Sequence, residues 1–290
     1  MDLYYYPLEH LYTPAKQLAD AGYSKAARTI FRTLESLYHT GITANNLAAF
    51  YETYSKNASR QVKHYYHVSF KRRPNIKAAC ALANIAFNEK QYKQALHYYK
   101  IAYHIRKRPE ICYNIAVQYN QLTEYRKAIF YISNAIPNLR ERYLRDAYVL
   151  VVYMYAIIGD KVKAREYFDR YIICYGEADI DLMYLAYLCE RYDYIDRHCL
   201  SLSQKEEFTL HDAALVIWVL KLLEKGKLAE YFVDKLARNP FYCGNIHWMK
   251  QCWEVYERLE EEKVFIYQPA LHIDIIKHSK FYMPKKRLPF

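Results

Sequence analysis

A short pattern of helical spacing recurs three times in the middle of this chain, and no other feature constrains the fold as much. In each copy a residue with a long side chain is followed three positions later by alanine. A second pair with the same spacing begins seven residues after the first. The copies start at Tyr92, Tyr125 and Lys161, so the period is 33 residues and then 36. Residues spaced three and four apart share one face of an α-helix. A period of this length predicts stacked helical hairpins, each unable to bury its apolar face alone.

A second pattern lies about ten residues before each copy and provides the other helix of each hairpin. It consists of two adjacent residues, apolar in every copy, and a third residue three positions further on. The three occurrences are Leu82, Ala83 and Ala86; Ile115, Ala116 and Tyr119; and Val151, Val152 and Tyr155. Each period therefore contains two amphipathic helices, which is the unit of an αα-solenoid.

The two patterns together resemble the tetratricopeptide repeat, a helix-turn-helix unit of about 34 residues with an A helix and a B helix. The first clear repeat matches it at Leu82, Ala83, Tyr92, Ala95, Tyr99, Ala102 and Pro109. The resemblance implies an all-α fold, a superhelix of about six to eight stacked hairpins. Specific matching covers about 100 residues, and the rest of the chain shares only the hairpin rhythm.

Three residues depart from the family's pattern. Lys161 stands where Tyr is typical, Val152 replaces a small residue, and Pro137 arrives early. Proline cannot continue a helix, because it lacks an N–H group and clashes with the preceding turn. Pro137 therefore predicts a shortened B helix in the second clear repeat.

The N-terminal part, residues 1–74, is predicted to form degenerate helical hairpins. Glycines are common just beyond helix ends, so Gly22 and Gly41 are interpreted as helix stops. A weaker repeat begins at Gly22 and places Ala26, Ile30 and Thr33 on its B helix.

The remaining chain divides into three further segments within what we predict to be one continuous domain. Residues 75–175 hold the clearest repeats, and residues 176–263 are predicted to form degenerate hairpins that end in a capping helix. That helix, over 246–263, is strongly amphipathic. Residues 264–290 form an irregular, basic C-terminal tail.

The net charge and the cysteine content restrict the classes of partner and the cellular compartment that we expect. The formal net charge is +11 with a pI near 9.1, which favours acidic partners without choosing among protein, nucleic acid and anionic membrane. Seven dispersed cysteines without a C-x-x-C pair are typical of reduced thiols. No secretory signal or membrane span is recognisable. We expect a cytoplasmic protein, or a nuclear one if residues 284–287 (PKKR) act as an import signal in a eukaryote.

The resemblance implies a groove lined by A helices that binds an extended peptide or a helix of a partner. The expected lining residues are Lys77, Asn84, Phe87, Tyr113, Asn114, Val117 and Tyr153. Some family members clamp a terminal carboxylate with Asn and basic side chains, and here Asn84 and Asn114 match the amide positions. The basic positions are not matched, so the charge-assisted part of such a clamp is missing. Ordinary helix-surface amides are the alternative interpretation.

A second candidate surface is basic and phased with the repeats. Clusters of cations recur about every 34 residues and are predicted to share one edge of the stack. This basic ridge consists of Lys71, Arg72, Arg73, Arg106, Lys107, Arg108, Arg140, Arg142 and Arg145. The cations either complement the negative ends of B-helix dipoles or dock an acidic protein segment or a phosphate backbone.

Catalytic and metal-binding motifs are not apparent in the sequence. The pair His64 and His67 lies one helical turn apart without an evident third ligand, and no nucleophile elbow or phosphate-binding loop occurs. We therefore predict a non-catalytic scaffold, adaptor or regulatory protein that needs no cofactor and binds an acidic protein segment. The alternative is an RNA- or DNA-binding repeat protein. Self-association through Trp248, Trp253 and Tyr256 is a further possibility.

Overall fold

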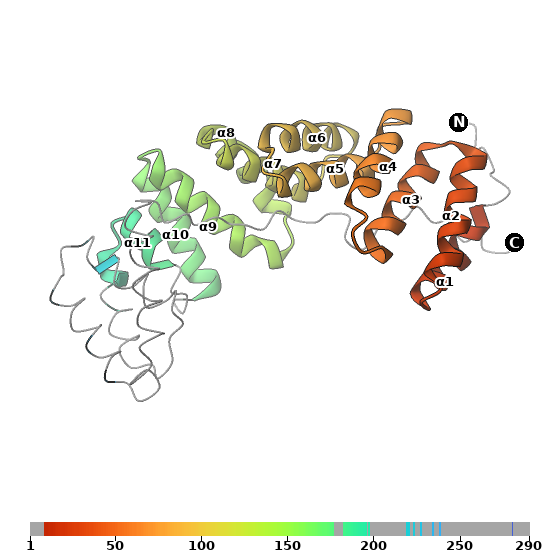
Figure 1. Cartoon of the computed structure of the whole chain (residues 1–290). Helices are drawn as coiled ribbons and strands as arrows, with labels where there is room; N and C mark the ends of the chain where they lie inside the picture. The colour runs from red at the N-terminus through yellow and green to blue at the C-terminus, as the bar shows by residue number, and fades with distance from the viewer. Residues whose placement is uncertain are drawn as a thin grey trace, which may run out of the picture. The chain divides into compact units, whose positions relative to one another are not determined.

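The computed structural model describes the chain as helical hairpins (Figure 1). The residues that it describes are 9–176, 182–195, 197, 219, 220, 223, 227, 234, 238 and 280. No strand occurs in this part of the chain, and the helices pack in consecutive pairs. The predicted all-α, tetratricopeptide-like solenoid is therefore confirmed.

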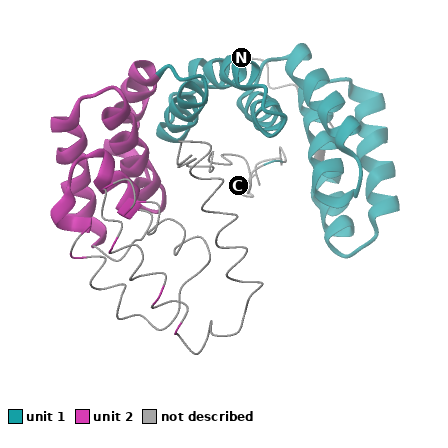
Figure 2. Ribbon diagram, turned by 60° about the vertical axis from the view of Figure 1, so that its left-hand side comes forward, with its two compact units in different colours: residues 1–124, 272–290 teal, residues 125–271 magenta. Residues whose placement is uncertain are grey.

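The chain forms two compact units (Figure 2). Unit 1 comprises residues 1–124 together with 272–290, and unit 2 comprises residues 125–271. The C-terminal residues thus return to the N-terminal unit.

Within the described residues, unit 1 contains three complete hairpins and the first helix of another. Each helix from α1 to α6 packs on the helix that follows it in the chain. The helices are α1 (Tyr12–Asp20, preceded by the 3-10 helix η1, Glu9–Leu11), α2 (Ser24–Tyr38), α3 (Gly41–Tyr54), α4 (Ser59–Arg72), α5 (Ile76–Asn88), α6 (Tyr92–Ile105) and α7 (Pro109–Gln121).

Unit 2 continues the same alternation in its described part. Helix α9 packs on α8, on α10 and on α11. The helices are α8 (Tyr125–Ala135, followed by the 3-10 helix η2, Ile136–Asn138), α9 (Glu141–Ile157), α10 (Lys161–Tyr175) and α11 (Leu182–Leu188).

One backbone feature marks the turn inside every hairpin. A single residue with positive φ follows each odd-numbered helix by two or three positions, which is a conformation that L-residues rarely adopt. These left-handed residues are Gly22, Asn57, Lys90, Thr123, Gly159 and Glu190. After α1, α5, α7, α9 and α11, the next residue's N–H also bonds a carbonyl five positions back, as in the Schellman cap. The recurrence sets the repeat register from Gly22 to Glu190.

The buried positions of the second helices follow the same register. Residues 5, 9 and 12 positions after each of the first five left-handed residues are buried, which is the spacing of one helix face. The buried sets are Ala27, Phe31 and Leu34; Val62, Tyr66 and Ser69; Ala95, Tyr99 and Ala102; Ala128, Ile132 and Ala135; and Ala164, Phe168 and Tyr171. The small residue at the first position lets neighbouring helices approach closely.

The register corrects two sequence interpretations in the N-terminal part. The predicted B-helix positions Ala26 and Thr33 are exposed, and Ile30 is only half-buried, because the true set begins one residue later. Gly41 does not end a helix, since it is the first residue of α3. The preceding helix α2 ends at Tyr38 because His39 is left-handed and Thr40 caps α3 through a reciprocal hydrogen-bond pair with Thr43.

Gly41 has a packing role at the start of α3. A Cβ atom at this position would lie 3.1 Å from the main-chain oxygen of Ser69 on α4. The Ser69 hydroxyl donates a hydrogen bond to the Gly41 carbonyl at 2.6 Å, so the backbones of the two helices lie close together here. The glycine therefore allows the close packing of α3 against the end of α4.

The effect predicted for Pro137 is confirmed. Helix α8 has 11 residues and passes into the 3-10 helix that contains Pro137, whereas α4 and α6 have 14 each. The missing N–H of proline ends the α-helical ladder at this point. The predicted capping helix over 246–263 and nearly all of the C-terminal tail lie outside the described residues.

Candidate partner-binding surface

Helices α3, α5 and α7 form the inner layer of unit 1, as their burial shows, whereas α1 buries one face only. Helix α7 is buried at every position from Glu110 to Tyr119, and α3 at every position from Thr43 to Tyr51. A helix buried around its whole circumference lies between other parts of the protein rather than at its surface. The even-numbered helices bury only one face.

The predicted groove residues all lie on odd-numbered helices, and they divide into two groups by exposure. Lys77, Asn84 and Phe87 on α5 are half-buried. Tyr113, Asn114 and Val117 on α7, in unit 1, and Tyr153 on α9, in unit 2, are buried within the chain itself. The α5 residues are therefore the accessible members of the set.

Asn84 holds a structural hydrogen bond. Its Oδ1 accepts a hydrogen bond of 2.7 Å from the hydroxyl of Tyr99 on α6, whose ring is fully buried. A buried phenol needs such a partner, because an unsatisfied hydroxyl in an apolar environment is costly. The amide that matched a carboxylate-clamp position thus joins the two helices of its own hairpin.

Lys77 lies at the start of α5, and burial lowers the pKa of its ammonium group from 10.5 to about 8. The cause is desolvation, which penalises the charged form of a lysine. A half-buried cation with a low pKa suits an anionic or hydrogen-bond-accepting partner group, which would stabilise the charged form.

Fully buried amide side chains are a feature of the inner layer that the helical periodicity did not indicate. Asn45 and Asn46 on α3, and Asn114 and Gln118 on α7, are all without exposed surface. In the described part of the chain, both polar atoms of Gln118 and the Oδ1 of Asn45 lack a hydrogen-bond partner. Such groups destabilise a fold unless something satisfies them, so they point to a ligand or to another chain segment.

Asn45 binds the main chain of a residue that is 235 positions away. Its Nδ2 donates a hydrogen bond of 2.8 Å to the carbonyl oxygen of Lys280. The Lys280 Nζ lies 2.8 Å from Oε1 of Glu52, two turns further along α3. The hydroxyl of buried Tyr66 on α4 donates to the other carboxylate oxygen of Glu52 at 2.7 Å. The sequence carried no signal for this contact, because nothing in residues 264–290 indicates where they dock.

The basic ridge of unit 1 is divided between structural and exposed cations. Arg72 pairs with the mostly buried Glu35 at 2.6 Å, and Arg108 lies 3.3 Å from the carboxylate of Glu110. Lys71, Arg73, Arg106 and Lys107 are exposed at or just beyond the ends of α4 and α6. These positions complement the negative ends of helix dipoles.

The third cluster of the ridge lies in unit 2, and its position differs. Arg140 is the N-cap residue of α9, and Arg142 and Arg145 lie in the first turns of that helix. Cations there do not complement the helix dipole. Instead, the guanidinium of Arg142 lies over the ring of Tyr143, 4.6 Å from its centroid, and Arg145 donates from Nε to the hydroxyl of Tyr171 at 2.8 Å.

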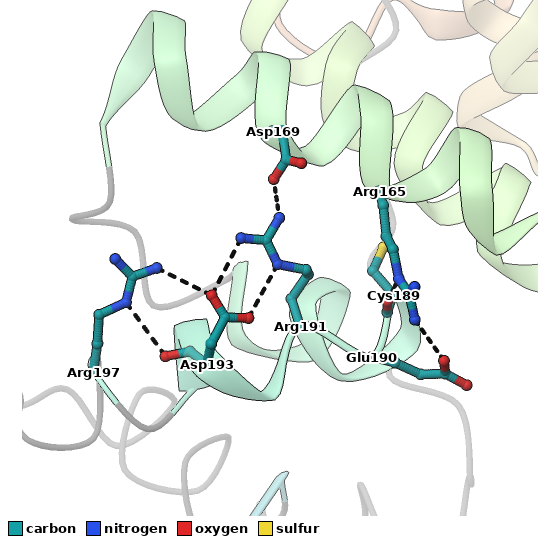
Figure 3. A network of polar contacts seen from close by, with 7 residues as sticks. All are labelled: Arg165, Asp169, Cys189, Glu190, Arg191, Asp193 and Arg197. Atoms are coloured by element: carbon teal, nitrogen blue, oxygen red, sulfur yellow. Dashed lines mark hydrogen bonds and ion pairs between the residues drawn. The ribbon is translucent and has the colours of Figure 1, made fainter.

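A network of ion pairs joins α10 to the residues that follow α11 (Figure 3). Arg165 bonds the carbonyl of Cys189 at 2.7 Å and the carboxylate of Glu190 at 2.6 Å. Arg191 pairs with both Asp169 and Asp193. Burial raises the pKa of the Cys189 thiol to about 12, so it stays protonated and unreactive. The role of the network is therefore structural.

Metal-holding groups and membrane-spanning helices are missing from the described residues. No group of three His, Cys, Asp or Glu side chains there is placed to hold a metal ion, and His64 and His67 do not gain a third ligand within these ranges. None of the described helices has the length and apolar character that a bilayer crossing requires. Cys80, Cys112, Cys174 and Cys189 are thiols rather than disulfides.

Comparison of the sequence with protein-family models and with curated proteins finds no match. Solved structures are similar in fold. A tetratricopeptide repeat protein from Parabacteroides merdae has a TM-score of 0.54 at 15% identity, over 84% of this chain and 98% of that one. PilF of Pseudomonas aeruginosa gives 0.49 at 14% identity, over 88% and 98%. Naa15/Naa10 bound to HypK-THB gives 0.47 at 15% identity, over 91% and 44%.

The fold and the register of the turns define the class of the molecule. The Parabacteroides protein matches over most of its own length, and the hairpins of this chain repeat with the spacing that tetratricopeptide units share. This chain therefore has a tetratricopeptide-like helical-repeat fold. A fold of this class hosts many unrelated functions, so the surface has to supply the functional argument.

Proposed function

We propose that this protein is a non-catalytic interaction scaffold whose inner helices bind an extended segment or a helix of a protein partner. The observation that carries the proposal is the contact between Asn45 and Lys280, in which an inner-layer amide binds the main chain of a segment remote in sequence. Amide side chains suit this task, because each offers both a donor and an acceptor to a peptide backbone.

The half-buried residues of α5 extend the same proposed surface. Lys77 and Phe87 lie on this helix, and the ring of Phe87 also contacts Tyr92 at 5.9 Å between centroids. A cation and an aromatic ring that are both partly exposed provide one polar and one apolar anchor for a partner. Tyr113, Asn114 and Val117 are buried on α7 of the same unit, so in our proposal they contribute to the packing of that unit rather than to direct binding.

Affinity capture with quantitative mass spectrometry tests the proposal. The full chain with Lys77→Ala and Phe87→Ala should lose at least one protein partner that the unchanged chain retains. Lys93→Ala is the matched control, since Lys93 is exposed on α6, an outer helix. Circular dichroism shows whether each variant keeps its helices. Retention of every partner by the folded double variant would contradict the assignment of Lys77 and Phe87 to the binding surface.

The exposed cations at the ends of α4 and α6 are the candidate contacts for the alternative function, which is nucleic-acid binding. A second experiment tests this alternative. Filter binding of RNA and DNA at two salt concentrations measures it, because phosphate binding weakens steeply with salt. Salt-sensitive binding that Arg73→Ala and Arg106→Ala abolish would favour this alternative over a protein partner. No binding at low salt removes it.

A further inference from the structure

We propose that Asn45 and Glu52 form a lysine-binding site on α3, and that Lys280 occupies it in the resting chain. The inference rests on the proposed function, because it names the chemistry of one part of the partner-binding surface. It assigns a basic segment to this part of the inner layer, although the net charge of the whole protein favours acidic partners.

The site recognises two groups of one residue. Asn45 and Glu52 are seven positions apart, so they lie on the same face of α3 about 10 Å apart along its axis. Asn45 binds the Lys280 carbonyl at 2.8 Å, and Glu52 binds the ammonium group at 2.8 Å. A residue that satisfies both contacts needs a long side chain with a terminal cation, and Lys280 provides it here.

The carboxylate is held in place before any lysine arrives. Tyr66 is fully buried on α4, and its hydroxyl donates to Oε2 of Glu52 at 2.7 Å. This leaves Oε1 directed to Nζ of Lys280. A side chain fixed by a second hydrogen bond loses less entropy on binding than a free one. The lysine ammonium is itself largely covered, since only 19% of its side chain is exposed.

The site also has an unused acceptor. Asn45 is without exposed surface, and within the described residues its Oδ1 accepts no hydrogen bond. A main-chain N–H of an extended segment could fill it, so the amide would bind that segment through both its donor and its acceptor. Glu52 lies five positions before the left-handed residue Asn57, and Gln118 on α7 lies five positions before the left-handed residue Thr123. Gln118 is another buried amide that lacks a partner in the described part of the chain.

The occupant in the resting chain is Lys280 of the chain itself, which contacts the site through its carbonyl oxygen and its ammonium group. A segment held in this way competes with a partner segment of the same chemistry. A partner would therefore need a lysine in an extended segment, and it would bind more tightly when Lys280 is removed.

Chymotrypsin cleavage after Phe281 and Tyr282 tests the contact in the full chain, because these bonds lie next to Lys280 and remain identical in all variants. Glu52→Gln and Lys280→Met should each speed cleavage about fivefold. The charge-swapped pair Glu52→Lys with Lys280→Glu should return the rate to within about twofold of the original. Glu89→Gln is the control, since it breaks an exposed pair with Lys63 in the same unit and should leave the rate unchanged. Equal rates in all variants would overturn the proposal.

A labelled synthetic peptide of residues 272–290 tests lysine recognition in trans. It should bind the Lys280→Met chain at least about fivefold more tightly than the unchanged chain, and a peptide with Lys280→Met should lose that advantage. Equal binding of the two peptides would refute lysine recognition. Loss of partner capture by the α5 variants is a separate result, so failure of the general scaffold proposal is distinguishable from failure of this site.

Discussion

The hydroxyl of Tyr99 on α6 donates a 2.7 Å hydrogen bond to the side-chain oxygen of Asn84 on α5. This bond joins the two helices of the hairpin in which the repeat pattern is clearest. It also gives Asn84 a structural role, although its position alone suggested a ligand contact. Whether a helix-surface amide serves a partner or the fold depends on what the neighbouring helix presents to it.

Removal of the Tyr99 hydroxyl should destabilise the protein. We expect Tyr99→Phe to cost about 1 kcal/mol, because the oxygen of Asn84 loses this donor. Tyr98→Phe is the matched control on the same helix, since its ring is buried against His67 and Phe70 and it forms no hydrogen bond of its hydroxyl in the described part of the chain. Urea denaturation measures both, and equal stability of the two variants would contradict a structural role for Asn84.

The ion pair of Arg72 predicts that one member of the basic ridge is structural. Arg72 Nη1 lies 2.6 Å from Glu35, whose side chain is only 10% exposed and also accepts from Thr43 at 2.5 Å. We expect Arg72→Met to lose about 1–2 kcal/mol, because the partly buried carboxyl group of Glu35 would lose its partner. Lys71→Met, at the exposed neighbouring position, should stay within about 0.5 kcal/mol. Equal losses of unfolding free energy in the two variants would contradict a structural role for the pair of Arg72 and Glu35.

The repeats from residue 75 to 175 could be predicted from sequence because their buried sets are chemically clear. Ala95, Tyr99 and Ala102 alternate small and large side chains at helical spacing, and the structure buries all three. The hairpin of α3 and α4 was predicted only as a degenerate one, because its second helix buries Val62, Tyr66 and Ser69 and has no alanine at these positions. In the first repeat, adjacent alanines at 26 and 27 left the register ambiguous by one residue.

The candidate site could be predicted only in part, for a different physical reason. The family resemblance placed Lys77, Asn84 and Phe87 on the first helix of a hairpin, and they lie half-buried on α5. Helical periodicity identifies which residues share a helix face. It carries no information about contacts between residues far apart in the chain. The contact of Asn45 with Lys280 depends on where the C-terminal segment docks, and the pairing of Arg72 with Glu35 depends on how α2 meets α4. Neither follows from spacing.

The left-handed turn residues predict opposite effects for two substitutions. Gly159 has φ of 84°, and the space that a Cβ atom would occupy there is open, so Gly159→Ala should cost about 1 kcal/mol through backbone strain alone. Thr123 adopts φ of 59°, and a β-branched residue is disfavoured there, so Thr123→Gly should gain up to about 1 kcal/mol. Thermal and urea unfolding measure both, and effects of the same sign would refute the assigned turn register.

The lowered pKa of Lys77 predicts how stability depends on pH. Burial brings this pKa from 10.5 to about 8, so between these values the unfolded chain holds a proton that the folded chain has lost. Stability contributed by this group therefore rises with pH across that window, and below about pH 8 the folded state carries the full cost of the buried charge. Lys77→Met should be more stable than the unchanged chain at pH 7, and its advantage should shrink as pH rises from 8 to 10.5. Lys93→Met, at an exposed position, should show a constant difference. Urea unfolding at several pH values measures the effect, and an advantage of Lys77→Met that did not change with pH would contradict the burial of this ammonium group.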